Sequence, residues 1–166
     1  MKEHSDLDKI WFVVSPHNPL KQSNTLLNEY NRFHLVSLAI ADNTGFRASN
    51  IEFSLPKPSF TIDTLTYLQE KFPLEKFTVI MGSDSYQNLP RWKNYEQVLA
   101  QCPIIVYQRP GHEAKEALSD RTLFLNAPLI DISATLIRSL IKDKKSVKYL
   151  LPDVVIDYIE DNGYYQ

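Results

Sequence analysis

The chain has a single cysteine, Cys102, among its 166 residues. One thiol can form neither an intramolecular disulfide nor a paired-cysteine metal site, so we expect a protein of a reducing compartment, the cytoplasm.

Long apolar stretches are also lacking. No run approaches the roughly 20 residues of a membrane-spanning helix, and residues 1–6 contain no apolar signal-peptide core. The sequence therefore predicts no membrane association.

Positive charge is not in excess, since 18 Lys and Arg residues stand against 20 Asp and Glu residues and the formal net charge is -2. That balance argues against nucleic acid as a partner, although a local basic pocket stays open. With 43% hydrophobic residues, the chain fills one substantial core and is too short for a second complete domain. We expect one domain over residues 1–166 and leave open whether it forms a homo-oligomer.

Short, continuously apolar runs that end in turn residues predict strands buried on both faces. These runs are residues 10–14, 77–81 and 104–107, and residues 51–55 alternate as a further strand. Apolar residues at helical spacing predict helices over residues 26–41, 61–72 and 95–99. We expect Thr61 to be the N-cap of the second of these helices, whereas residues 114–119 are too few to assign.

Two further helices are predicted in the last third of the chain. Ser133 caps the first, which turns Leu136, Ile137, Leu140 and Ile141 inward, and Pro152 opens the second, which ends near Gly163. This alternation of apolar strands and helices predicts an α/β fold, a Rossmann-like doubly wound parallel sheet. Ligands of such folds bind beyond the carboxyl ends of the strands. The candidate segments are residues 15–21, 82–84, 109–111 and 133–138.

Residues 132–138 read Ile-Ser-Ala-Thr-Leu-Ile-Arg and combine a helix start with a guanidinium group. The hydroxyls of Ser133 and Thr135 fall in the first turn, where unpaired N–H groups and the helix dipole favour an anion, and Arg138 follows one turn later. The pattern suits a phosphate group. An ordinary helix cap with a solvated arginine is the alternative.

Three other stretches carry side chains suited to binding. Residues 15–21, Ser-Pro-His-Asn-Pro-Leu-Lys, form a proline-rich turn that ends in Lys21, and a rigid exposed turn is the alternative. Residues 59–65, Ser-Phe-Thr-Ile-Asp-Thr-Leu, form a helix start suited to a carboxylate, or else a plain cap. Residues 81–84, Met-Gly-Ser-Asp, offer a backbone that a ligand can approach and an acceptor for ribose hydroxyls. Downstream, Trp92 offers a flat ring face or is a half-buried surface aromatic.

Taken in chain order, the four stretches at residues 15–21, 59–65, 81–84 and 132–138 resemble those of bacterial nicotinate-nucleotide adenylyltransferases, members of the nucleotidyltransferase superfamily. The resemblance covers nearly the whole chain, with Phe60 in place of a tyrosine. It implies a fold of the nucleotidyltransferase type. It also implies adenylyl transfer in NAD biosynthesis: the phosphate of nicotinate mononucleotide attacks the α-phosphorus of ATP, which is accompanied by Mg²⁺, and deamido-NAD and pyrophosphate form. No separate protein metal site is implied.

The resemblance assigns a role to each candidate residue. Ser133, Thr135 and Arg138 bind the ATP phosphates, and Lys21 and Arg138 are the catalytic cations. Gly82 and Asp84 bind the nucleotide ribose, Thr61 reaches the nicotinate carboxylate, and Trp92 stacks on the pyridine ring. Arg109 is a weaker candidate, and Arg32 fits the family pattern but is expected to serve helix packing.

One family element has no counterpart. Family members open with a strand that runs into Gly-x-x-x-Pro-x-His-x-Gly-His, and none of the four histidines here is followed by that pattern. We therefore expect a nucleotidyltransferase domain that lacks its first strand and helix because the sequence starts at an internal methionine. The alternative is a natural protein that functions in this shortened form. An intact mass of 19.2 kDa for the native protein would contradict this expectation.

Two alternative functions stay open. Phosphopantetheine adenylyltransferase shares the pattern around Arg138 but does not call for Thr61 and Trp92 together. A shortened nucleotide-binding protein without turnover would keep Asp84 and Trp92 and release no pyrophosphate.

Overall fold

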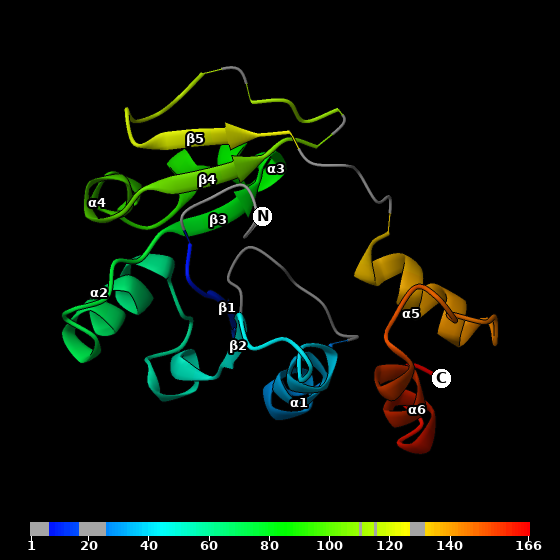
Figure 1. The fold of residues 1–166 in the computed structure, drawn as a ribbon. Coiled ribbons are helices and arrows are strands. Elements are labelled where there is room, and N and C mark those ends of the chain that lie inside the picture. The colour runs from blue at the N-terminus through cyan, green and yellow to red at the C-terminus, as the bar shows by residue number, and fades with distance from the viewer. Residues whose placement is uncertain (1–6, 17–25, 110, 115, 127–131) are drawn as a thin grey trace. The chain divides into compact units, whose positions relative to one another are not determined.

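The computed structural model describes residues 7–16, 26–109, 111–114, 116–126 and 132–166. The chain divides into two compact units, Met1–Pro58 with Ile130–Gln166 (unit 1) and Ser59–Leu129 (unit 2). Each unit combines helices with parallel strands (Figure 1). Over the described ranges, no helix is both long and apolar enough to cross a membrane.

The described residues of unit 1 form a two-stranded parallel sheet and three α-helices. The strands pair in register from Ile10 opposite Phe46 to Val13 opposite Ser49. The elements are β1 (Ile10–Val13), α1 (Glu29–Ala39), β2 (Phe46–Ser49), a 3₁₀ helix (Ile51–Ser54), α5 (Ala134–Lys142) and α6 (Asp153–Asp161).

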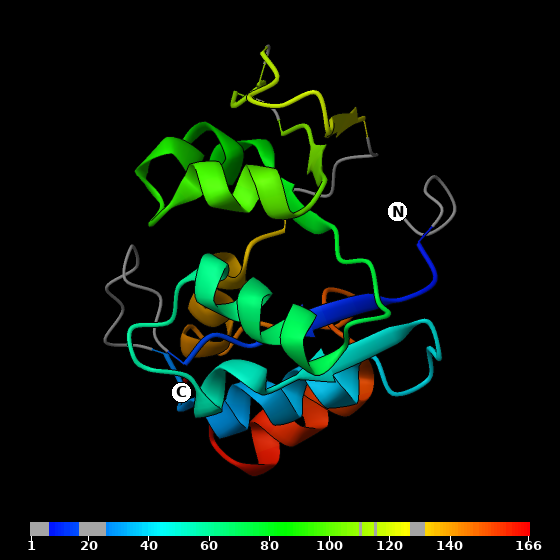
Figure 2. The ribbon, with the colours of Figure 1, turned by 90° about the vertical axis from the view of Figure 1, so that its left-hand side faces the viewer.

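Helices α1 and α6 of unit 1 pack against each other, and α1 also packs against β2 (Figure 2). Asn28 caps α1, because its Oδ1 accepts hydrogen bonds from the N–H groups of Tyr30 and Asn31 at 2.9 and 3.1 Å. The C-terminal end of α6 is followed by Gly163, whose φ of 62° suits glycine. The Tyr164 N–H donates to the Ile159 carbonyl at 3.0 Å and completes this C-terminal cap.

Unit 2 contains a three-stranded parallel sheet in the order β3-β4-β5 with its own helices. Gly82 lies opposite Tyr107, and Tyr107 lies opposite Leu125, so the carboxyl ends of the three strands are level. The elements are α2 (Thr61–Lys71), β3 (Val79–Gly82), α3 (Ser83–Gln87), a 3₁₀ helix (Leu89–Arg91), α4 (Tyr95–Gln101), β4 (Ile104–Tyr107) and β5 (Thr122–Leu125).

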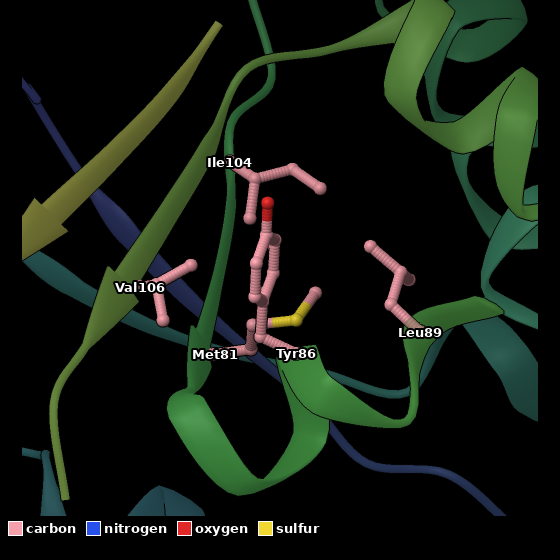
Figure 3. Close-up of a cluster of buried hydrophobic side chains, with 5 residues drawn as sticks. All are labelled: Met81, Tyr86, Leu89, Ile104 and Val106. Carbon is pink, nitrogen blue, oxygen red and sulfur yellow. The ribbon is translucent and has the colours of Figure 1, made fainter. Parts of the chain in front are cut away.

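A cluster of five buried side chains joins the sheet of unit 2 to α3. Its members are Met81, Tyr86, Leu89, Ile104 and Val106. Figure 3 shows Tyr86 of α3 next to Met81, with Val106 on one side, Leu89 on the other and Ile104 beyond the hydroxyl end of the ring. The hydroxyl of the buried Tyr86 has a hydrogen-bond partner, since it accepts from the Leu118 N–H at 2.6 Å. Burial of these side chains fixes β3 and α3, which carry the candidate ribose-binding residues.

Most predicted elements are confirmed within a few residues, and the strands are parallel as predicted. One prediction is wrong: residues 51–55 are not a strand, since Ile51–Ser54 form a 3₁₀ helix and the strand is Phe46–Ser49. The Phe53 N–H bonds to the Asn50 carbonyl at 2.9 Å and the Ser54 hydroxyl to the Ile51 carbonyl at 3.0 Å. Local hydrogen bonds therefore prevail over the alternating pattern.

Smaller corrections concern ends of elements, a second missed strand and the short helix α3, which was not predicted. Thr61 is the first residue of α2 rather than its N-cap, because Phe60 has the extended cap conformation. Pro152 is likewise the N-cap of α6 rather than its first residue. Leu136 is 42% exposed although it was predicted to turn inward, whereas Ile137 is buried. The strand Thr122–Leu125 escaped prediction because four half-exposed residues give too short a pattern.

Candidate active site

Two loops of unit 2 meet at the carboxyl ends of β3 and β4. Ser83, which follows β3, is fully buried, and its hydroxyl accepts a hydrogen bond from the Arg109 N–H at 2.9 Å. The bond ties the start of α3 to the loop after β4. The parallel register brings these loops together, as expected for a ligand site of an α/β fold.

Gly82 is required here by close packing rather than by an unusual φ. A Cβ added at this position would lie 2.5 Å from Oδ1 of Asp84 and 3.0 Å from Nε of Arg109. It would also lie 3.3 Å from the ring of Tyr107. Any larger residue would push these side chains apart. Glycine therefore fixes the spacing of the groups at this sheet edge.

Asp84 and Arg109 form an exposed ion pair that leaves acceptor capacity unused. Nη1 of Arg109 lies 3.4 Å from Oδ2 of Asp84, and its Nη2 donates to the Tyr107 hydroxyl at 2.8 Å. Oδ1 of Asp84 is buried and has no hydrogen-bond partner within the described part of the chain. A buried carboxylate oxygen without a donor is costly, so the arrangement suits a ligand that brings hydroxyl donors, such as ribose.

Trp92 and Thr61 come from different segments of unit 2. Trp92 ends the 3₁₀ helix, where its N–H donates to the Leu89 carbonyl at 2.9 Å, and its half-buried ring packs against the edge of the Met81 cluster. Thr61 is half-buried at the start of α2. Both placements are compatible with binding and with the packing alternatives.

Lys93 connects these two segments, and sequence reasoning gave it no role. Its Nζ lies 3.1 Å from Oδ2 of Asp63 in the first turn of α2 and 4.6 Å from the ring centroid of Phe60. The turn that begins with Thr61 is thereby held to the residue that follows Trp92. No sequence signal identifies this pair, because the two residues are 30 positions apart.

The candidate phosphate-binding residues of unit 1 lie within one helix. The Ser133 hydroxyl accepts a hydrogen bond from the Leu136 N–H at 3.1 Å, which confirms the predicted cap of α5. Nη2 of Arg138 lies 3.2 Å from the Thr135 hydroxyl oxygen, to which it donates. Ser133 and Thr135 are exposed. Lys21 lies outside the described residues.

Arg32 of unit 1 holds the start of the proline-rich loop. Its guanidinium donates to the carbonyls of Leu27, Ser15 and Pro16 at 3.0, 2.8 and 3.1 Å. These bonds fix the backbone just after β1, whereas the sequence predicted only a helix-packing role for Arg32. Tyr165, next to the C-terminus, interacts electrostatically with Arg32 and with Arg138. Burial raises the pKa of this phenol above its ordinary value of 10.0, and the two guanidinium charges act in the opposite direction.

The chemistry of the two sets differs. Unit 1 offers hydroxyl donors and a cation, and unit 2 offers a carboxylate, a cation and an indole face. Of the residues that the structure describes, no three His, Cys, Asp or Glu side chains form a group that could hold a metal ion. Hydroxyls, a helix start and arginine suit phosphates, while the carboxylate suits sugar hydroxyls.

Comparison with known proteins shows the family of the chain. The cytidylyltransferase-like family model matches residues 1–140. A probable nicotinate-nucleotide adenylyltransferase from Cytophaga hutchinsonii is 47% identical over 166 residues, which cover 99% of this chain and 86% of the relative. The chain belongs to the nicotinate-nucleotide adenylyltransferase family. Another member, nicotinate-nucleotide adenylyltransferase from Bacillus subtilis, is 33% identical over 96% of this chain and 84% of its own length.

The fold of the family is also found among solved structures. The nicotinic acid mononucleotide adenylyltransferase of Plasmodium falciparum, complexed with NaAD, is similar with a TM-score of 0.78. The match covers 95% of this chain and 82% of that one at 19% sequence identity. This likeness supports the nucleotidyltransferase-type α/β fold that the sequence predicts.

Proposed function

We propose that this adenylyltransferase-family chain transfers the adenylyl group of ATP to nicotinate mononucleotide, giving deamido-NAD and pyrophosphate in NAD biosynthesis. The observation that carries the proposal is the 47% identity to a probable nicotinate-nucleotide adenylyltransferase over 99% of the chain. The phosphate of the mononucleotide attacks the α-phosphorus of ATP, the bond to the β-phosphate oxygen breaks, and pyrophosphate leaves. No covalent enzyme intermediate is required.

Unit 2 is proposed to bind nucleotide and nicotinate groups. Oδ1 of Asp84, which lacks a donor among the described residues, accepts hydrogen bonds from the ribose hydroxyls. Gly82 leaves room for the side chains of Asp84, Arg109 and Tyr107. Trp92 offers a partly exposed ring face to the pyridine, and the N–H groups of the α2 start at Thr61 receive the nicotinate carboxylate. Arg109, already engaged by Tyr107, is a weaker candidate.

Unit 1 is proposed to bind the ATP phosphates. Ser133, Thr135 and the N–H groups of α5 donate to phosphate oxygens, and Arg138 stabilises the charge that develops in the transition state. Lys21 is proposed as a second cation. Because the reaction needs no protein nucleophile, catalysis consists of positioning the two reactants and stabilising charge.

Mg²⁺ is proposed to arrive with ATP rather than to reside in the protein. The ion keeps several waters and binds phosphates readily, so it does not need a protein cage. The donor set at the start of α5, two hydroxyls and a guanidinium, suits phosphates that already carry a cation.

We further propose that residues 1–166 work as one nucleotidyltransferase domain. The family model supports this, since its match over residues 1–140 includes residues of both units. The alignment to the Plasmodium falciparum enzyme, which covers 95% of the chain, supports it as well.

The decisive assay is pyrophosphate release by the purified chain with ATP and Mg²⁺. Nicotinate mononucleotide is one acceptor and phosphopantetheine the comparison, and a version extended by the codons upstream of Met1 is run in parallel. We expect release with nicotinate mononucleotide and none with phosphopantetheine. Turnover by the extended version alone would agree with the expected upstream histidine element. Binding of ATP without release by either version would favour the nucleotide-binding alternative.

A further inference from the structure

Lys93 contacts the helix turn to which the nicotinate carboxylate is assigned. Its Nζ lies 3.1 and 3.3 Å from the two carboxylate oxygens of Asp63, the third residue of α2. It also lies over the ring of Phe60, which precedes the helix. Two independent contacts therefore hold the ammonium group at the start of α2, next to Thr61.

The charge of Asp63 affects any anion that approaches this turn. An ionised aspartate in a first helical turn stabilises the helix, since it faces the positive end of the dipole. The same charge repels an anionic ligand at the same N–H groups. Lys93 places a positive charge within hydrogen-bond distance of both Asp63 oxygens, so that the pair as a whole is neutral. Side-chain exposures of 44% and 40% mean that solvent and salt moderate the effect.

We propose that Lys93 is a specificity-determining residue, which neutralises Asp63 and so allows the α2 start at Thr61 to accept the carboxylate of nicotinate mononucleotide. The inference rests on the proposed function, which assigns the carboxylate to this turn. Without Lys93, the charge of Asp63 disfavours the nicotinate carboxylate but not the neutral amide of nicotinamide mononucleotide. Lys93 thus acts on the choice between these two substrates rather than on the chemical step.

The test is the substrate preference of Lys93→Met, which keeps the apolar stem and removes the charge. We expect kcat/KM for nicotinate mononucleotide to fall roughly threefold to tenfold at low salt, with little change for nicotinamide mononucleotide. Adding Asp63→Asn to Lys93→Met should restore the wild-type ratio of the two values. A loss that is due only to altered packing would lower both values together.

Lys71→Met is the matched control, because Lys71 lies at the other end of α2 over the ring of Tyr67, at 5.5 Å. It should leave the ratio unchanged. An unchanged ratio in Lys93→Met, or failure of Asp63→Asn to restore it, overturns the proposal. Absence of pyrophosphate release by both the purified chain and its upstream-extended version would instead refute the proposed function. Calorimetric titration with the two mononucleotides then gives the ratio of their Kd values, and a change of that ratio in Lys93→Met still decides the role of Lys93.

Discussion

In unit 2, the residues that follow β3 bond to the loop after β4, whereas in unit 1 the bonds of Ser133 and Arg138 stay within α5 and its cap. Ser83 and Asp84 meet Arg109 across 25 or 26 positions of sequence. Ser133 and Arg138 bond only three positions away, to the Leu136 N–H and the Thr135 hydroxyl. These unit 2 residues are therefore both candidates for the site and part of the packing that holds the loops, while the unit 1 candidates depend on a helix end alone.

This difference predicts how each set responds to substitution. A change in the unit 1 set should affect ligand binding or turnover with little effect on stability, because exposed polar groups on a helix contribute little to folding. A change in the unit 2 set should affect both, because close packing leaves no room for adjustment. Measuring activity and stability on the same variants separates the two behaviours.

The largest effect on activity is expected from Arg138→Gln in unit 1. The substitution keeps a polar, helix-compatible side chain and removes the charge, so kcat should fall about 100- to 1000-fold. The free energy of unfolding should change by less than about 0.5 kcal/mol. Steady-state kinetics and urea unfolding measure the two quantities.

Lys142→Gln, in the last turn of the same helix, is the matched control and should retain full activity. An Arg138→Gln enzyme with wild-type kcat would show that the guanidinium does not act on the phosphates. A large stability loss would instead contradict the contrast between the units.

The next effect is expected from Gly82→Ala in unit 2. The new Cβ would lie 2.5 Å from Oδ1 of Asp84, so the carboxylate must shift, and a shift of about 1 Å costs about 100-fold in kcat/KM. The free energy of unfolding should also fall, by about 1–3 kcal/mol. Kinetics and thermal unfolding of the variant test both statements.

Gly163→Ala in unit 1 provides the comparison. No atom of the described residues lies within 4 Å of a Cβ there, but φ is 62°, so the free energy of unfolding should fall by about 1 kcal/mol while kcat/KM is retained. If kcat/KM and the free energy of unfolding change equally in the two glycine variants, Gly82 is not needed to make room for the Asp84 carboxylate.

The smallest effect concerns the interior of unit 2, where Cys102 is buried among Ile62, Leu65 and Val98. Burial raises the pKa of this thiol above its ordinary value of 9.0. The folded thiol therefore resists ionisation, and its contribution to stability is fully present below pH 9 and lost as the pH rises further. Between pH 8 and pH 10, the wild type should lose more unfolding free energy than Cys102→Ala, up to the roughly 1.3 kcal/mol that ionisation of the unfolded thiol can supply.

Urea unfolding under reducing conditions at the two pH values checks this prediction. Parallel pH dependence of the two proteins would show that the thiol is accessible to solvent when folded. Such a result would weaken the view of unit 2 as the tightly packed unit.

Local patterns were enough for much of the fold and for the unit 1 set. The cap at Ser133, the closing glycine Gly163 and the apolar strand 104–107 each follow from a few neighbouring residues, and the structure agrees with all three. The strand at 46–49 was missed because its register depends on β1, more than 30 positions away. Strand pairing is non-local, so a short half-exposed strand leaves almost no pattern in its own sequence.

The sequence by itself determined the α/β class, the helix start at Ser133 and the family motifs, because helix caps and buried strands are encoded by adjacent residues. Only the tertiary structure decided that Gly82 must be small, that Oδ1 of Asp84 lacks a protein donor and that Lys93 pairs with Asp63. Each of these facts depends on groups brought together from distant positions by the packing of unit 2. Packing of that kind follows from the register of whole strands and helices, which no short stretch of sequence contains.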